Sequence, residues 1–143
     1  MNIKITGMGS YIPSQIEANE KFYQHDFLNA DGSVINNSTE VIVKKFKAIT
    51  GIEERRYIKN ELNNSDIAAL AAQKAIINAD INSEDLDYII VAHNYGDIAH
   101  GTVQSDTVPS IASRVKHLLK IKNPRCVAYD ILFGCPGWVE GVI

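Results

Sequence analysis

The sequence has few of the residues that build crosslinked or membrane-spanning proteins. Its 143 residues include two cysteines, four prolines and one tryptophan. Two cysteines are too few for a disulfide scaffold, which favours a reduced, cytoplasmic setting. A transmembrane helix needs about 20 apolar residues, whereas the apolar runs here are only a few residues long, so no membrane partner is expected. The N-terminus likewise lacks the long apolar core of a signal peptide and is predicted to be a strand.

A basic excess is also missing. The 14 Lys and Arg residues are outnumbered by 17 Asp and Glu residues, giving a net charge of −3, so nucleic acid is not an expected partner. The four histidines form no i, i+4 pair, so no metal site is predicted. With 45% apolar and 22% charged residues, the composition is that of a globular protein. The length suits one domain, or half of a larger one.

Alternating strand and helix patterns predict an α/β fold with a largely parallel sheet. The short apolar runs at 87–92 and 126–132 are typical of strands covered on both faces. Before these two strands, the capping signal Ser65-Asp66 predicts the start of an Ala-rich helix over 67–79. The small residues of this helix permit close packing. The remaining elements are expected as a strand at 3–12, helices at 17–22 and 39–47 (the latter ending at Gly51), a short strand at 53–58, and helices opening at Pro109 and after Cys135.

Two Gly and loop features have functional and structural interpretations. Gly7 and Gly9 form G-x-G without a third glycine, which favours close backbone packing over a dinucleotide site. The polar segment 94–107 is long for a connection between a strand and a helix, so a functional loop is predicted there.

Cys135 is the strongest candidate for chemistry. It follows a predicted buried strand and Gly134, and Pro136 suits a first helical turn, which places the thiol at a helix N-terminus. The helix dipole and the free N–H groups there favour thiolate, and the N–H of Cys135 itself would form part of an oxyanion hole. A buried structural cysteine is the alternative for this position.

The other candidate groups have weaker patterns. Cys126 lies in a predicted strand and is interpreted as core. A thiolate nucleophile commonly needs a His partner. His93, at a strand end, and His100, in the loop, are both candidates, but no pattern selects either, and an ordinary capped or solvated histidine is the alternative for each.

Taken in order, the motifs resemble the N-terminal half of the β-ketoacyl-acyl-carrier-protein synthase III family, a group of thiolase-superfamily condensing enzymes. The resemblance spans nearly all 143 residues and implies a half-domain (1–143) of a thiolase-like layered fold, its mixed, largely parallel sheet covered by helices. The similar segments are Ile5–Pro13 (G-x-G-x-Y-x-P), Thr50–Arg55 (T-G-I-x-x-R), Ser65-Asp66 before the Ala-rich helix, Asp87–Val91, Val108–Ser110, and Ala128–Asp130 with Gly134–Gly137 (C-x-G).

The resemblance implies a mechanism. Cys135 would accept an acyl group from a thioester of coenzyme A or acyl-carrier protein, and malonyl-acyl-carrier protein would then condense with it, as in fatty acid biosynthesis. The resemblance implies that the protein needs no cofactor and forms a homodimer. The catalytic His and Asn of the family lie in a C-terminal half absent from this chain, so the chain alone is expected to be inactive as a synthase.

Three departures concern the substrate. Lys45 and Ile49 stand near the places where the family often carries a Trp and an Arg for coenzyme A, which favours another carrier of the acyl group. Val108 takes the place of a large residue that the partner subunit contributes to the acyl pocket, which implies room for a longer or branched chain. The loop 94–107 is longer than usual, so the pocket entrance is expected to differ.

Two alternatives stay open beside the synthase III interpretation. One is a related thiolase-superfamily acyltransferase of secondary metabolism, with head-to-head condensation or ester formation. The other is a non-catalytic partner subunit that keeps the fold and binds acyl-carrier protein. The presence of Cys135 counts against the non-catalytic interpretation.

Overall fold

The computed structural model describes residues 4–143, and the chain divides into two compact units. The first, here called the sheet unit, comprises the residues up to Tyr11 together with Asn60–Ile143. The second, the ribbon unit, is Ile12–Lys59. The chain therefore starts in the sheet unit, leaves it, and returns.

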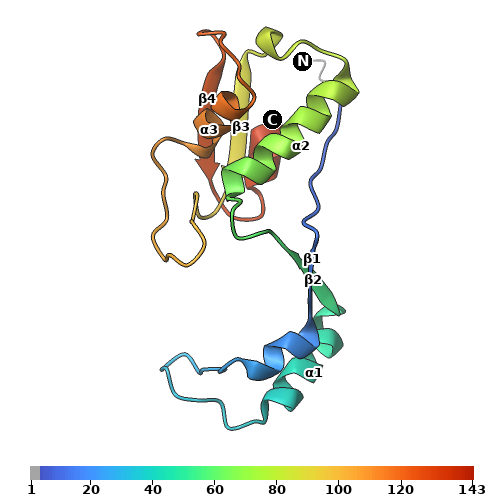
Figure 1. Ribbon diagram of the computed structural model, residues 1–143, viewed down its shortest axis with the longest axis vertical. Helices are drawn as coiled ribbons and strands as arrows, with labels where there is room; N and C mark the ends of the chain where they lie inside the picture. Colours follow the sequence, from blue (N-terminus) through green and yellow to red (C-terminus); the bar gives the residue numbers. More distant parts are fainter. Residues whose placement is uncertain (1–3) are drawn as a thin grey trace. The chain divides into compact units, whose positions relative to one another are not determined.

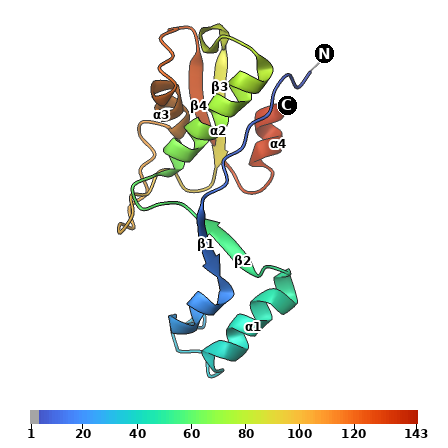
Figure 2. The same ribbon diagram turned by 45° about the vertical axis from the view of Figure 1, so that its right-hand side comes forward.

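A parallel pair of strands forms the centre of the sheet unit. β3 (Tyr88–His93) pairs with β4 (Val127–Leu132), with Tyr88 opposite Val127 and His93 opposite Leu132. Helices α2 (Asn64–Ala79) and α3 (Ile111–Leu118) lie on one face of this sheet, and α4 (Gly137–Val142) lies on the other (Figures 1 and 2). The predicted α/β class, with parallel strands covered by helices, is confirmed.

The core of the sheet unit lies between the strands and helices α2 and α3. Ile111 and Val115 of α3 are 0% and 1% exposed and cluster with Ala69 of α2. Ile89 and Val91, alternate residues of β3, point toward this face and pack against the cluster. The intervening residues of β3 face α4. The glycines of α4 permit this close approach, since a Cβ on Gly137 would lie 3.4 Å from Ala92.

The prediction of a strand at 3–12 is wrong for residues 4–12, which form no strand. Residue 3 lies outside the described residues. The segment instead lies along α2 (Figure 2), where the Met8 N–H donates to Asn78 Oδ1 at 3.0 Å. A Cβ on Gly7 would lie 2.6 Å from Ala79 of α2. Backbone atoms of α2 also lie within 3 Å of where a Cβ on Gly7 or Gly9 would be, so the interpretation of the glycines as close-packing residues is confirmed.

The ribbon unit has its own small sheet. β1 (Gln15–Ala18) and β2 (Glu54–Tyr57) pair antiparallel. β1 was not predicted, and it takes the first two residues of the helix expected at 17–22, which begins only at Asn19 as the 3-10 helix η1 (Asn19–Gln24). The second expected helix is α1 (Thr39–Thr50). Gly51 ends α1 with φ 72°, a left-handed conformation that favours glycine, as predicted.

Two helix starts differ from the prediction by a few residues. α2 begins at Asn64, and Asp66 is its third residue, whose carboxylate accepts the backbone N–H of the capping residue Asn63 at 2.8 Å. The cap of α3 is Ser110, so Pro109, which follows a cis peptide bond, precedes the helix. A short 3-10 turn, η2 (Ser83–Asp85), joins α2 to β3. Within residues 4–143, no helix is long and apolar enough to cross a membrane.

Candidate functional site

Cys135 lies on the turn between β4 and α4. The N–H of Gly137 closes this turn by donating to Gly134 O at 2.8 Å, and the thiol-bearing residue is exposed. The structure places Pro136 at the cap of α4 and not in its first turn, so Cys135 stands one residue before the cap. Between residues 4 and 143, no backbone oxygen accepts a hydrogen bond from the Cys135 N–H, which leaves this donor available to a ligand.

A small open pocket of about 200 Å³ surrounds Cys135. One wall comes from the end of β3 and the other from the turn after β4. Its residues are mostly apolar, with Trp138 68% exposed at its edge. The pocket is lined by Ala92, His93, Asn94, Phe133, Gly134, Cys135 and Trp138.

The structure brings His93, a candidate partner of the thiol, into this pocket, but both of its ring nitrogens are occupied. Nδ1 accepts the backbone N–H of Gly96 at 2.8 Å, and Nε2 lies 2.9 Å from Asp130 Oδ2. Because Nδ1 accepts a hydrogen bond, the ring proton is on Nε2, which donates to the carboxylate. The imidazole is therefore neutral and buried. His100, the other candidate, lies exposed in the loop and is not among the pocket residues.

Asp130 is the most heavily hydrogen-bonded side chain near the site. Its carboxylate accepts the N–H groups of Ile111 at 2.7 Å and Ala112 at 2.8 Å, in addition to His93. These two N–H groups belong to the first turn of α3, where an anion satisfies free donors and interacts favourably with the helix dipole. A single buried carboxylate thus joins β4, β3 and α3.

A second buried carboxylate anchors the loop that follows β3. Asp97 accepts the Ser65 N–H at 2.8 Å and the Ser65 hydroxyl at 2.6 Å, at the N-terminus of α2. Arg114 of α3 lies 3.5 Å from Asp97 and 2.5 Å from Asp106. Asp97 and Asp106 also exchange backbone hydrogen bonds, of 2.9 and 2.7 Å. The base of the predicted functional loop is therefore closed and tied to two helices.

Other predicted residues lie apart from Cys135. Cys126 is 3% exposed, which confirms its interpretation as core. Val108, the predicted acyl-pocket residue, is 82% exposed and is not among the residues that line the Cys135 pocket. Lys45 and Ile49 are exposed positions of α1 in the ribbon unit.

The sequence interpretation missed Asp130 and Asp97. The available signal for Asp130 was a charged residue inside the apolar run 126–132, since a buried charge needs partners. Asp97 has no comparable signal, because it lies in a polar loop where an aspartate is ordinary.

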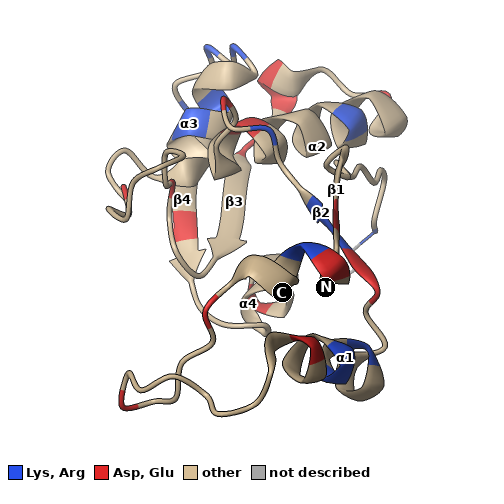
Figure 3. Ribbon diagram, turned by 60° about the horizontal axis from the view of Figure 1, so that its bottom comes forward, with Lys and Arg blue, Asp and Glu red and all other residues tan. Residues whose placement is uncertain are grey.

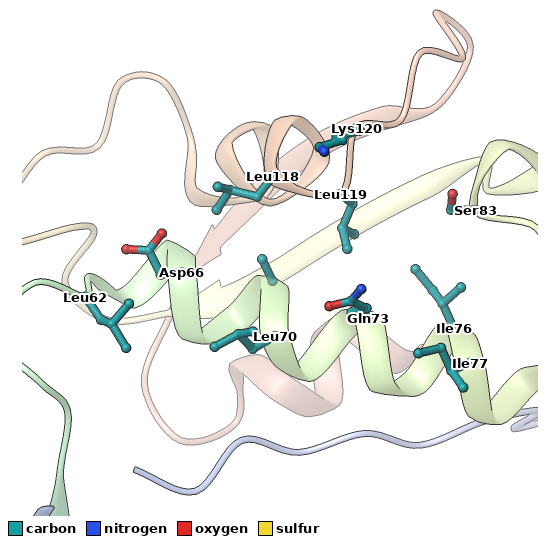
Figure 4. Close-up of a pocket in the computed structure, with 11 residues that line it drawn as sticks. Leu62, Asp66, Leu70, Gln73, Ile76, Ile77, Ser83, Leu118, Leu119 and Lys120 are labelled. Carbon is teal, nitrogen blue, oxygen red and sulfur yellow. The ribbon is translucent and has the colours of Figure 1, made fainter. Parts of the chain in front are cut away.

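The larger cavity of the sheet unit does not contain Cys135. It is an open groove of about 530 Å³ between α2 and the end of α3 (Figure 4). Apolar side chains dominate it, with Asp66 and Lys120 among the few charged groups. We assign the chemistry to the smaller pocket because it holds the nucleophile. The labelled residues of the groove are Leu62, Asp66, Leu70, Gln73, Ile76, Ile77, Ser83, Leu118, Leu119 and Lys120.

Comparison with known proteins identifies the relatives of the chain. No family model matches it. Beta-ketoacyl-[acyl-carrier-protein] synthase III 1 of Vibrio parahaemolyticus is 37% identical over 139 residues, which are 97% of this chain and 37% of the relative. The synthase III of Clostridium beijerinckii is 34% identical over 142 residues, 99% of this chain and 36% of the relative. The chain is a relative of the β-ketoacyl-acyl-carrier-protein synthases III. It spans little more than a third of their length.

Solved structures agree with this relationship. The synthase III of Aquifex aeolicus superposes with a TM-score of 0.68 at 29% identity, covering 97% of this chain and 37% of that one. OleA of Xanthomonas campestris, at 19% identity, has a TM-score of 0.72 over 99% of this chain and 38% of that one, and so shows the fold alone. The predicted fold class, a part of the synthase III fold, is confirmed.

Proposed function

We propose that Cys135 is the acyl-accepting nucleophile of a synthase III-type acyltransferase. The observation that carries this proposal is its exposed thiol on a strand-to-helix turn, beside a small pocket, in a chain related to synthases III. A sharp turn of this kind presents a nucleophile to solvent while the strand behind it stays packed.

In the proposed acyl transfer, the thiolate sulfur of Cys135 attacks the carbonyl carbon of an acyl thioester. A sulfur–carbon bond forms, the carbonyl oxygen gains negative charge, and the free N–H of Cys135 is suited to stabilise it. The original thioester bond then breaks, and its thiolate leaves and takes up a proton from solvent. The acyl group stays on Cys135, and the step needs no cofactor.

The condensation is a proposal for the whole protein. A malonyl thioester on acyl-carrier protein would lose CO₂, and the resulting carbanion would attack acyl-Cys135, forming a carbon–carbon bond and releasing the Cys135 thiolate. By the family resemblance, a His and an Asn outside this chain assist this step. We therefore propose that the chain alone accepts acyl groups without condensing them, and that the whole protein acts as a homodimer.

Mass spectrometry of the chain after incubation with acyl-coenzyme A and with acyl-acyl-carrier protein tests the nucleophile. We expect the acyl mass on the Cys135 peptide, none on the Cys126 peptide, and none on Cys135→Ser. Loss of the label on treatment with hydroxylamine identifies a thioester. Absence of acylation with every donor in the whole protein contradicts the proposal and favours the non-catalytic partner subunit.

Val108 is proposed to contact the acyl chain in the pocket of a second subunit. Its 82% exposure leaves the side chain available for this contact, and its small size leaves space there. In the whole protein, Val108→Phe should shift the preference toward shorter acyl donors without changing the site of acylation. An unchanged chain-length preference would contradict this assignment.

A further inference from the structure

We propose that His93 is a positioning residue for Cys135 and not the base that removes its proton, an inference that rests on the proposed role of Cys135. The residue lines the Cys135 pocket, which makes it the obvious candidate for a base. Its hydrogen bonds indicate the other role.

The side chain of His93 fixes one wall of the pocket. Through Nδ1 it holds the N–H of Gly96, three residues further along the chain, at 2.8 Å. This bond closes the turn that contains Asn94, a pocket residue. Gly96 has φ 79°, and a Cβ on this residue would lie 2.8 Å from the Asp106 carbonyl oxygen, so the turn packs closely against the returning loop.

His93 also ties this wall to the strand that carries Cys135. Nε2 donates to Asp130, five positions before Cys135, and the backbone carbonyl of His93 accepts the Phe133 N–H at 3.2 Å. Asp130 is itself held by α3, and Asp97, next to Gly96, is held by α2. The imidazole therefore connects two walls that are each anchored to a helix.

The same bonds leave no lone pair for the thiol proton. Nε2 already carries hydrogen, and a proton on Nδ1 would remove the acceptor of the Gly96 N–H. Asp130 of β4 contacts the imidazole, Cys135 lines the same pocket, and Asp97, which pairs with Arg114 of α3, directly follows the Gly96 that bonds to Nδ1. Asp130 stabilises the observed orientation of the ring.

Two neutral replacements separate positioning from proton transfer. In His93→Asn, the amide oxygen stands near the place of Nδ1 and keeps an acceptor for Gly96. In His93→Gln, the amide nitrogen stands near the place of Nε2 and keeps the donor to Asp130, whereas Gly96 loses its acceptor. Neither side chain titrates, so a base would be lost equally in both.

Three readouts apply to the full chain: amide hydrogen exchange at Gly96, the rate of Cys135 alkylation by iodoacetamide as a function of pH, and alkylation of the buried Cys126 as a folding control. We expect exchange at Gly96 to rise roughly tenfold or more in His93→Gln and to stay within about threefold of wild type in His93→Asn. The limiting alkylation rate of Cys135 at high pH should change by about threefold or more in His93→Gln, which frees the turn with Asn94, and by less in His93→Asn, because the backbone bond from Phe133 to His93 still joins the two walls. The midpoint of the pH profile should stay within about 0.3 units in both.

A midpoint that moves by about one unit or more in both variants would show that His93 titrates with the thiol, and would overturn the proposal. Equal effects of the two variants on the limiting rate, no effect in either, or alkylation of Cys126 in either, would also overturn it. Failure of wild-type Cys135 to accept an acyl group contradicts the proposed function alone, because none of the three readouts uses a thioester.

Discussion

The sheet unit and the ribbon unit place their charges differently. In the sheet unit, the carboxylates of Asp97 and Asp130 are only 3% and 5% exposed, and each accepts at least two hydrogen bonds. In the ribbon unit, Lys and Arg residues follow α1 and β2 (Figure 3), and most of the charged residues are exposed. Two of its ion pairs, Lys47 with Glu53 and Arg56 with Glu54, are solvent-exposed on both sides.

Buried hydrogen-bonded charges restrict the local geometry more strongly than exposed ion pairs do. A buried charge without its partner costs several kcal/mol, so the hydrogen bonds of the sheet unit strongly favour a single geometry around Cys135. Exposed ion pairs contribute about 0–1 kcal/mol each and specify little. The ribbon unit depends more on its aromatic cluster, in which the Arg55 guanidinium lies over Phe22 and Phe46.

The largest effect is expected from Asp130→Asn. The amide keeps one acceptor oxygen but turns a nitrogen donor toward donors that Asp130 now satisfies in His93, Ile111 and Ala112. We expect a loss of about 3–5 kcal/mol in the free energy of unfolding of the sheet unit, measured by hydrogen exchange resolved along the chain. Asp87→Asn, at an exposed position just before β3, is the matched control and should change little. Equal effects of the two variants would refute the comparison.

Gly7→Ala is expected to have the second largest effect. A methyl group would lie 2.6 Å from the Ala75 carbonyl oxygen and 2.6 Å from the Ala79 side chain on α2, so the N-terminal segment must move away. Such crowding typically costs about 1–3 kcal/mol. The control is Gly134→Ala, whose Cβ would have its nearest neighbour at 3.9 Å. Exchange along α2 should rise in the first variant and stay unchanged in the second.

Arg55→Lys tests the aromatic cluster of the ribbon unit. The guanidinium lies 5.3 Å from the Phe22 ring and donates to Asn19 Oδ1 at 2.7 Å, and lysine cannot reproduce both its planar stacking and its directed donor. We expect a loss of about 1–2 kcal/mol, seen as faster exchange within 12–59. Arg56→Lys, in an exposed pair with Glu54, should be nearly silent. Faster exchange in the sheet unit would be evidence against two separately stabilised units.

The smallest effect is expected from Glu53→Gln. The hydrogen bond and charge of Lys47 lower the pKa of Glu53, and those of Glu53 raise the pKa of Lys47. The Lys47–Glu53 pair therefore stabilises the folded state fully at pH values between the pKa of Glu53 and the pKa of Lys47 in the unfolded chain. This stabilisation is lost as pH falls through the lowered pKa of Glu53 or rises through the raised pKa of Lys47. Near neutral pH, the free energies of unfolding of the wild type and of Glu53→Gln should differ slightly, and this difference should disappear in acid and in high salt. A difference that survives both would require another cause.

Patterns close in the sequence predicted most of the fold. The apolar runs gave β3 and β4, and Gly51 marked the end of α1, because periodicity and chain-end conformations are local properties. The N-terminal strand was misplaced because its alternating pattern says nothing about what lies beside it. Here that neighbour is α2, some 70 positions away in sequence.

The candidate site was predictable only in part for the same reason. Cys135 follows from the strand, glycine and proline around it. The bonds of His93 to Asp130 and of Ser65 to Asp97 join residues 37 and 32 positions apart, and they fix how the walls of the site are held together. No local pattern contains that information.

The discontinuous path of the sheet unit has a consequence for the order of assembly. Residues up to Tyr11 pack on α2, which begins at Asn64, so the whole ribbon unit is an insertion between two pieces of one body. During synthesis the first segment emerges early, yet its binding surface on α2 is complete only after Ala79 has left the ribosome. The ribbon unit has no such delay, since its strands and helices all lie within one continuous stretch. The N-terminal segment thus resembles an intramolecular ligand of α2: the intervening chain keeps it nearby until the helix that binds it has been synthesised.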